Sequence, residues 1–371
     1  MQAQSLHRAS DHATIFGIDG AETSADAKPA RPSPGRHLDG LRREAVALAL
    51  HETNNGSNGR ALAARKSMEK YKLGRTGLDV SLLTFGCGAV GGLMTKGDAA
   101  DQDRAVAWAR DNGINHFDTA PLYGNGASEK NLNRALGANR EGLVISTKVR
   151  LLGDDRENPE AAVFRSIDES LKRLGQDHVD LFQLHNTLGE PDDEELMTAD
   201  EVLDRVVPAF EKVKEAGKTR FLGFTAKGDS DMLLALVDSG AFDAAQVFYN
   251  LLNPSAMMAL PPDYPAQDYK GLLKACDQKG VGSIGVRVLA GGALSGSTAR
   301  HPVSMQDVAP IGSAPDFETD AANARRFMTL IDEGHAANLA ELAIRYAVST
   351  PELDTTEIGI ATIEELQAAA A

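Results

Sequence analysis

The stretch NHFDTAPLYGNGASEKNLNRALG, residues 115–137, decides the fold because a strand pattern runs directly into a helix pattern. Its first six residues read as a strand, and residues 128–137 read as a helix that ends at Gly137, as helices often do. A second strand pattern follows at 143–148. Residues 159–174 then form an amphipathic helix pattern, with apolar side chains three or four positions apart. Strand and helix alternate, which is typical of proteins with a parallel sheet.

The alternation continues in both directions. Upstream, KYKLGRTGLDVSLLTFG reads as a small hairpin that leads into a first strand at Ser81–Phe85. Downstream, strand patterns fall at 180–185, 219–225, 244–250, 283–289 and 356–362, and helix patterns at 201–216, 232–240, 272–280 and 321–348. About eight such units over roughly 300 residues fit an open doubly wound sheet or a closed (β/α)8 TIM barrel. Their number favours the barrel, and the turn GCGAVGG lacks the G-x-G-x-x-G spacing of a Rossmann turn.

The amino-terminal part of the chain differs from the rest. Residues 1–69 hold the loop-like stretches ARPSPG and NNGSNG and one short helix pattern at 41–51. We expect a disordered extension here, followed by an α/β barrel domain at 70–371. The alternative is that Met68 is the true start of the protein. No basic segment followed by an apolar one is present, so a secretory leader is not expected.

Composition narrows the possible partners and compartment. The net charge of −15 argues against nucleic acid and anionic membrane surfaces as partners. No apolar run approaches the roughly 20 residues that span a bilayer. The two cysteines, Cys87 and Cys276, are too few for a disulfide framework and favour a cytoplasmic location. Composition does not set an oligomeric state.

Four ionisable side chains are predicted to meet at one end of the barrel. Three consecutive strand patterns end in Asp118, Lys148 and His185, and Tyr123 follows Asp118 by five positions. The carboxyl ends of the strands carry the active site in such barrels. A lone charged pair there would suit a structural salt bridge, whereas four converging groups favour a functional site.

The motifs FDTAPLYGNGASE, VISTKV, SLKRLGQDHVDLFQLH and KTRFLGF resemble those of the aldo-keto reductase superfamily, in the family's order and spacing. The resemblance runs from Lys70 to the end of the chain. It implies an oxidoreductase that interconverts a carbonyl and an alcohol with NAD or NADP. The family's catalytic tetrad falls on Asp118, Tyr123, Lys148 and His185. The stretch around Tyr123 is similar to the sugar dehydrogenase branch, which favours aldehydes, sugars, lactols or lactones as small-molecule substrates.

The chemistry of these four groups is coherent. Carbonyl reduction needs a hydride on carbon and a proton on oxygen, and a free tyrosine, with a pKa near 10, is a weak donor. Lys148 is expected to lower the pKa of Tyr123, and Asp118 to keep Lys148 charged and oriented. His185 would hydrogen-bond the substrate oxygen. Tyr123 would then act as the acid in reduction and as the base in oxidation.

The resemblance also implies a nicotinamide dinucleotide, NADP(H) or NAD(H), across the barrel mouth. LAGGALSG at 289–296 matches the family's loop over the pyrophosphate, where glycines let the backbone approach phosphate; the alternative is a plain loop. The candidate cofactor contacts are Gly86, Cys87, Gly88, Thr225, Gln246, Arg287, Leu289, Gly291, Gly292, Gly359, Thr362 and Glu365.

The sequence departs from the family pattern in three places. The Ser-Asn pair that often holds the carboxamide is Thr225-Ala226, of which only Thr225 has a hydrogen-bonding side chain. Val286 stands where an aromatic residue often stacks on the nicotinamide. Ala361 stands where a lysine or arginine often binds the 2′-phosphate of NADP. The missing cation weakens the case for strict NADP preference, so NAD stays open.

No cluster with metal-ligand spacing occurs in the sequence, and no metal is expected. His116 is predicted to point away from the site and His178 to precede a strand, so both are interpreted as structural. The substrate pocket is expected to be lined by Val90, Met94, Leu122, Asn186 and residues 251–265.

Two other functions stay open. One is a regulatory subunit of aldo-keto reductase fold, like those of potassium channels, that binds cofactor without significant turnover. The other is an unrelated barrel lyase or isomerase that uses Lys148 as a Schiff-base amine. The four intact tetrad residues favour the reductase.

Overall fold

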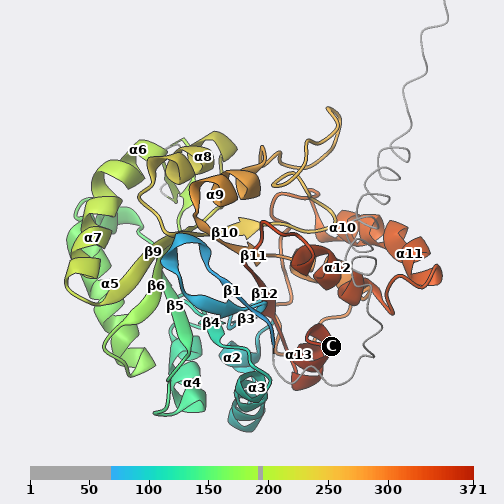
Figure 1. Cartoon of the computed structure of the whole chain (residues 1–371), viewed down its shortest axis with the longest axis horizontal. Helices are drawn as coiled ribbons and strands as arrows, with labels where there is room; N and C mark the ends of the chain where they lie inside the picture. Colours follow the sequence, from blue (N-terminus) through green and yellow to red (C-terminus); the bar gives the residue numbers. More distant parts are fainter. Residues whose placement is uncertain (1–67, 191–194) are drawn as a thin grey trace, which may run out of the picture.

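The computed structural model describes residues 68–190 and 195–371. Eight parallel strands close into a barrel in the order β10-β11-β12-β3-β4-β5-β6-β9, and helices surround it (Figure 1). The barrel strands are β3 (Leu83–Gly86), β4 (His116–Asp118), β5 (Val144–Val149), β6 (Val179–Leu184), β9 (Thr219–Thr225), β10 (Ala244–Phe248), β11 (Gly282–Val286) and β12 (Thr355–Gly359). The predicted (β/α)8 barrel is confirmed.

The helices pack their apolar faces against the outside of the barrel. In α5 the side chain of Asn158 caps the amino end, and Val163, Ile167 and Leu174 are buried against the core. The helices are α2 (Leu93–Lys96), α3 (Ala99–Asp111), α4 (Ala127–Leu136), α5 (Pro159–Leu174), α6 (Ala199–Glu201), α7 (Val207–Glu215), α8 (Ser230–Ser239), α9 (Leu272–Lys279), α10 (Phe317–Ala324), α11 (Met328–Asp332), α12 (Leu339–Val348) and α13 (Ile363–Ala369). In the part of the chain that the structure describes, no helix is both long and apolar enough to cross a membrane.

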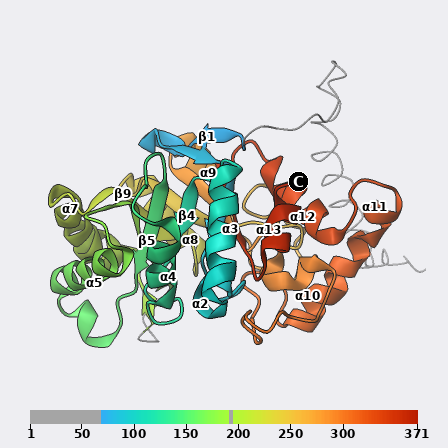
Figure 2. The same ribbon diagram turned by 90° about the horizontal axis from the view of Figure 1, so that it is seen from below.

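The amino end of the barrel is closed. Strands β1 (Lys70–Lys72) and β2 (Asp79–Ser81) form the predicted hairpin, which Figure 2 shows at one end of the barrel with α2 at the other. Leu73, Leu78 and Val80 of the hairpin pack against apolar side chains from the barrel interior. A Cβ on Gly282 would lie 2.7 Å from the Leu73 side chain, so only glycine leaves room for this contact. The open end is therefore the carboxyl end of the strands.

Two predicted helices are wrong in detail. The pattern at 321–348 is not one helix, because residues 333–338 separate α11 from α12: Gly334 has a φ of 82°, and Asn338 caps α12. The pattern at 201–216 begins earlier, at Ala199, and contains a π-helical turn at Val202–Val206. Helix α3 was not assigned from the sequence at all. The helix pattern at 41–51 lies outside the described residues.

The carboxyl end also carries two additions to the plain barrel. The short strands β7 (Thr187–Leu188) and β8 (Leu196–Met197) pair after β6. After β11 the chain forms the 3-10 turn η4 (Ala290–Ser295) and then α10 to α12, which lie to one side of the barrel in Figure 1. These segments build the walls of the cavity described next.

Candidate functional site

The floor of the site is a buried ion pair between neighbouring strands. Side chains alternate along a strand, so Asp118 at the end of β4 and Lys148 near the end of β5 both point into the barrel. Both side chains are completely buried and form an ion pair. Lys148 also donates to the Thr119 carbonyl at 2.9 Å, and Gln183 donates to the second Asp118 oxygen at 2.8 Å. The carboxylate and the ammonium are thereby held in one arrangement.

Tyr123 and His185 lie above this pair. The Lys148 ammonium is 4.9 Å from the centre of the Tyr123 ring. The Tyr123 and His185 rings meet edge to face, with their centres 6.0 Å apart. A Cβ on Gly88 would lie 3.7 Å from the Tyr123 ring, so the turn after β3 packs against the tyrosine. The structure thus brings together the four residues that the strand ends predicted.

The pKa values of these groups depend mostly on burial. Burial raises the pKa of Tyr123 to about 12, although Lys148 acts in the opposite direction. The expected effect of Lys148 is therefore present, but the expected net lowering is wrong. Burial also lowers the pKa of Lys148, but Asp118, Tyr123 and Glu357 outweigh it and keep the pKa above its ordinary value. Burial, and then Lys148, lower the pKa of His185 to about 3, so its ring is neutral at pH 7.

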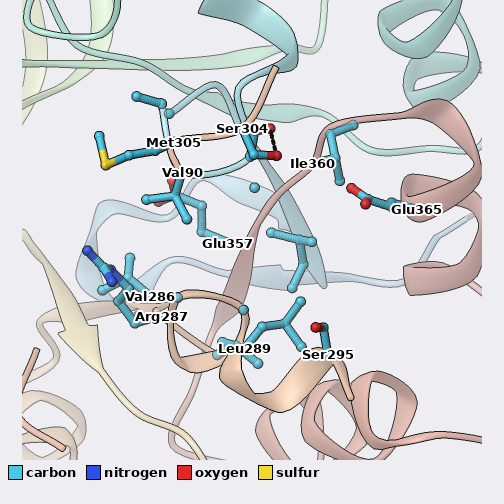
Figure 3. A pocket seen from close by; sticks show the side chains of 18 of the residues that line it. Val90, Val286, Arg287, Leu289, Ser295, Ser304, Met305, Glu357, Ile360 and Glu365 are labelled. Atoms are coloured by element: carbon cyan, nitrogen blue, oxygen red, sulfur yellow. Dashed lines mark hydrogen bonds between the residues drawn. The ribbon is translucent and has the colours of Figure 1, made fainter. Parts of the chain in front are cut away.

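A cavity of about 1050 Å³ opens above these residues at the carboxyl end of the barrel, and both Tyr123 and His185 line it. Figure 3 shows Glu357 between two groups of lining residues: Val286, Arg287, Leu289 and Ser295 on one side, and Val90, Ser304, Met305, Ile360 and Glu365 on the other. Most of the predicted cofactor contacts line the cavity: Gly88, Thr225, Gln246, Arg287, Leu289, Gly291, Gly292, Gly359 and Glu365.

Three predicted cofactor contacts do not line the cavity. Cys87 is buried in the core, and burial, reinforced by Asp118, raises the pKa of its thiol. Gly86 faces the barrel interior, where a Cβ would lie 2.9 Å from a Glu357 oxygen. Thr362 caps α13 by accepting from the Glu365 amide. Its role is therefore local, as a helix cap.

Only two of the residues expected to line the substrate pocket, Val90 and Leu122, line the cavity. Val286, which stands where an aromatic residue often stacks on the nicotinamide, lines it as well. Met94 is buried in the core, and residues 251–265 are not part of the lining. Asn186 is also absent from it, because its side-chain amide bonds the backbone of Leu151, a contact that joins neighbouring loops.

His116 was predicted to point away from the site, but its side chain faces the barrel interior. It lies two positions before Asp118, so both side chains face the barrel interior. Its ring bonds Thr84 at 2.8 Å and Ser146 at 2.6 Å, one layer below the ion pair. Burial, and then Lys148, lower the pKa of His116 to about 3. The structural role predicted for His116 agrees with these contacts, whereas the predicted orientation was wrong.

Several polar residues of the cavity were not predicted from the sequence. Glu357 on β12 reaches into it and accepts from Gln246 at 2.9 Å, and Gln246 in turn accepts from Thr225 at 2.9 Å. Burial, and then Asp118, raise the pKa of Glu357 to about 8. A glutamate in the middle of an apolar strand pattern was the available signal. Three cations in loops were also missed: Arg150, Lys227 and Arg300.

Metal binding has no visible basis in the described residues, where no group of three or more histidine, cysteine, aspartate or glutamate side chains could hold an ion. His178 is exposed just before β6. The remaining cysteine, Cys276, is buried in α9 and unpaired.

Comparisons with known proteins agree with this architecture. The model of the aldo/keto reductase family matches residues 82–371. The chain is 30% identical to L-galactose dehydrogenase of Arabidopsis thaliana over 312 residues, 81% of this chain and 86% of that protein. It is 32% identical to D-threo-aldose 1-dehydrogenase of a Pseudomonas species, over 60% of this chain and 69% of the other. The holo form of an aldo-keto reductase from Bacillus halodurans has a TM-score of 0.59 at 23% identity, covering 82% and 90% of the two chains.

A closed parallel barrel of this topology with a cavity at its carboxyl end defines the class of (β/α)8 barrel proteins. Within that class, the chain belongs to the aldo/keto reductase family of oxidoreductases.

Proposed function

We propose that the protein interconverts a carbonyl and an alcohol with NAD(H) or NADP(H), using Tyr123 as the proton donor in reduction and the acceptor in oxidation. The observation that carries the proposal is the position of Tyr123, which lines the cavity while its ring rests 4.9 Å from a buried, ion-paired ammonium. A tyrosine that gives up its proton needs a neighbouring positive charge to stabilise the phenolate. Lys148 carries that charge.

The other residues support this proton transfer. Asp118 and the Thr119 carbonyl fix the ammonium of Lys148, so that the charge needs no rearrangement as the tyrosine ionises. His185 is neutral, and its Nδ1 has no partner among the described residues. We assign the ring N–H to Nε2, because on Nδ1 it would be buried without an acceptor. This N–H would donate to the substrate oxygen beside Tyr123.

The cavity fits a nicotinamide dinucleotide. When bound, the cofactor supplies or accepts the hydride. In the loop after β11, Gly291 and Gly292 have φ values of 65° and 106°, and a Cβ on Gly291 would lie 2.8 Å from the Arg287 guanidinium. Only glycine suits this backbone, which would face the pyrophosphate with Arg287 and Arg300 nearby. Gln246 and Thr225 would hold the carboxamide.

We further infer that the substrate is a small polyhydroxylated aldehyde, lactol or sugar, oxidised at its anomeric carbon or reduced in the reverse direction. Two sugar dehydrogenases among the similar proteins support this class. The cofactor preference stays open between NAD and NADP. Ala361, the position expected to carry a phosphate-binding cation, is buried and does not line the cavity.

Oxidation of NADH or NADPH in the presence of 4-nitrobenzaldehyde tests the proposal. The variant Tyr123→Phe should lose at least about 100-fold in kcat, the contribution of a general acid, and should bind both cofactors as the wild type does. Tyr71→Phe, in the hairpin at the opposite end of the barrel, is the matched control and should leave kcat unchanged. If Tyr123→Phe kept the wild-type kcat, Tyr123 would not be the proton donor.

A regulatory function is the second candidate, because a Schizosaccharomyces pombe protein named for a potassium channel beta subunit is 28% identical over 79% of this chain. Tight cofactor binding without turnover of any aldehyde, sugar or alcohol would favour it. A Schiff-base mechanism has less support. Lys148 is buried in an ion pair that raises its pKa, whereas an amine nucleophile must be neutral. Borohydride trapping with substrate should yield no adduct.

A further inference from the structure

Two cations, Arg150 and Lys227, lie beside the neutral His185 on one side of the cavity. Arg150 follows β5, His185 follows β6 and Lys227 lies just after β9, and these three strands are neighbours in the barrel. All three side chains line the same cavity as Tyr123. Arg150 and Lys227 are close enough to His185 to lower its pKa further, after burial and Lys148. The local charge is thus opposite to the net charge of −15 of the whole chain.

The backbone holds Lys227 firmly in this position. The Lys227 amide donates to the Thr225 carbonyl at 2.8 Å, and its carbonyl accepts from Leu188 at 2.8 Å. The next residue, Gly228, has a φ of 111° and forms a β-bridge with Leu188. A Cβ on Gly228 would overlap the Leu188 carbonyl, so only glycine fits here. Lys227 is therefore presented to the cavity by two loops that are bonded to each other.

Within the described ranges, 68–190 and 195–371, the Lys227 ammonium makes no hydrogen bond or ion pair. The nearby acidic group, Glu195, pairs with Arg150 and only raises the pKa of Lys227 from a distance. The Lys227 side chain is half-buried, and burial, followed by Arg150, lowers its pKa. The neighbouring Arg150 pairs with Glu195 at 2.5 Å, which leaves its charge partly compensated. A half-buried charge without a partner costs free energy unless a ligand supplies the opposite charge.

We propose that Lys227, with Arg150 beside it, binds an anionic group on the substrate, so that the enzyme acts on a hydroxy-carbonyl compound carrying a carboxylate or a phosphate. This inference rests on the proposed function, because it places the reacting carbon at Tyr123 and His185. It narrows the substrate class from neutral sugars to acidic ones, such as uronates or sugar phosphates. Lys227 is thereby a specificity-determining residue.

We assign this cluster to the substrate rather than to the cofactor's phosphates, although Arg287 is close enough to Lys227 to lower its pKa. The cations beside the glycine loop are Arg287 and Arg300, which bond the Ala309 and Gly291 carbonyls on the β11 side of the cavity. Lys227 and Arg150 follow β9 and β5, on the side of His185. A role in substrate binding therefore predicts that removing Lys227 leaves cofactor affinity unchanged.

Matched substrate pairs test the inference: D-galacturonate against D-galactose, and D-glyceraldehyde 3-phosphate against D-glyceraldehyde. The wild type should prefer the anionic member of at least one pair, and the responding pair tells carboxylate from phosphate. Lys227→Met should lower kcat/KM for that anion about 10- to 100-fold, mainly through KM, because a hydrogen bond to a charged group is lost. The neutral member should change by less than about 2-fold, and Lys227→Arg should restore most of the preference.

Lys218→Met is the control, because Lys218 precedes β9 at the closed end of the barrel and pairs with Asp168 on the surface. It should behave as the wild type. The inference is overturned if the wild type prefers the neutral members, if Lys227→Met affects both members of a pair equally, or if it weakens NADH or NADPH binding in the absence of substrate.

A binding measurement separates this inference from the proposed function. Calorimetric titration of the protein with D-galacturonate and with inorganic phosphate needs no turnover. At least one of these anions should bind to the wild type and to Lys227→Arg but bind at least about 10-fold more weakly to Lys227→Met. Binding that depends on Lys227 in a protein without turnover would support the anion site and reject the reductase. If the protein turned over only neutral sugars and all variants bound the anions equally, the reductase would be supported and the anion site rejected.

Discussion

The two sides of the cavity are built by different means. On the β4–β6 side, Asp118 and Lys148 extend from strands and satisfy each other in complete burial. On the β11 side, a loop turns through Gly291 and Gly292 with positive φ and is held by Arg300, which donates to the Gly291 carbonyl at 2.6 Å. The first side is fixed by sheet geometry. The second side depends on contacts between loops and is free to differ among proteins that share the barrel.

The largest expected effect comes from breaking the strand-built side. Lys148→Met leaves the Asp118 carboxylate buried without its partner, and it should cost about 3–5 kcal/mol of unfolding free energy. Urea denaturation measures this loss. The double variant Asp118→Asn with Lys148→Met should recover most of it, because neither charge is then left unpaired.

Lys212→Met is the matched control for that experiment. Lys212 and Glu160 are 2.5 Å apart, but both side chains are half exposed. This exposed pair should contribute less than about 1 kcal/mol. If Lys148→Met lowered the free energy of unfolding no more than Lys212→Met, the Asp118–Lys148 pair would not behave as a desolvated pair. The strand-built side would then owe nothing to burial of its charges.

The strand-built side could be predicted from the sequence because a strand has a period of two residues and barrel sites lie at strand ends. Asp118, Lys148 and His185 each end an apolar run, which is enough to place them together. The same period should have placed His116 on the inner face with Asp118, and that signal was overlooked. Glu357 carries the same signal on β12, where Thr355 and Glu357 share the inner face.

The loop-built side could not be predicted to the same depth. The motif LAGGALSG marks the turn after β11, but Arg300 reaches it from nine residues beyond Gly291. Lys227 faces His185 only because Gly228 bridges to Leu188, some forty positions earlier in the chain. Such contacts depend on how separate loops pack, and no local periodicity records them. The break between α11 and α12 did carry a local signal, the polar stretch DEGH at 332–335 with Gly334 at a φ of 82°, and it was overlooked.

A smaller effect is expected from loosening the loop-built side. Arg300 stacks over Phe317, with its guanidinium 4.7 Å from the ring centre, in addition to bonding Gly291. Arg300→Met should raise the Kd of NADH and of NADPH alike by about 10-fold, because the loop loses a charge-assisted bond. Arg300→Lys keeps the charge but not the planar guanidinium, so its Kd values should lie between those of the wild type and Arg300→Met. Cofactor fluorescence titration measures all three proteins. A loss confined to NADPH would instead place Arg300 at the 2′-phosphate.

The smallest effect concerns Glu357, which lies between the two sides. Its pKa is raised from 4.5 to about 8, by burial first and then by Asp118. Between these values the folded protein holds a proton that the unfolded chain has lost, so the contribution of Glu357 to stability is complete below about pH 4.5 and declines as the pH rises through 8. Glu357→Gln keeps the bond from Gln246 and removes this titration. The variant should match the wild type near pH 5 and exceed it by at least about 1 kcal/mol at pH 9, as measured by urea denaturation at both pH values. Equal stability at pH 9 would mean that the carboxylate is better solvated at the cavity floor than its burial suggests.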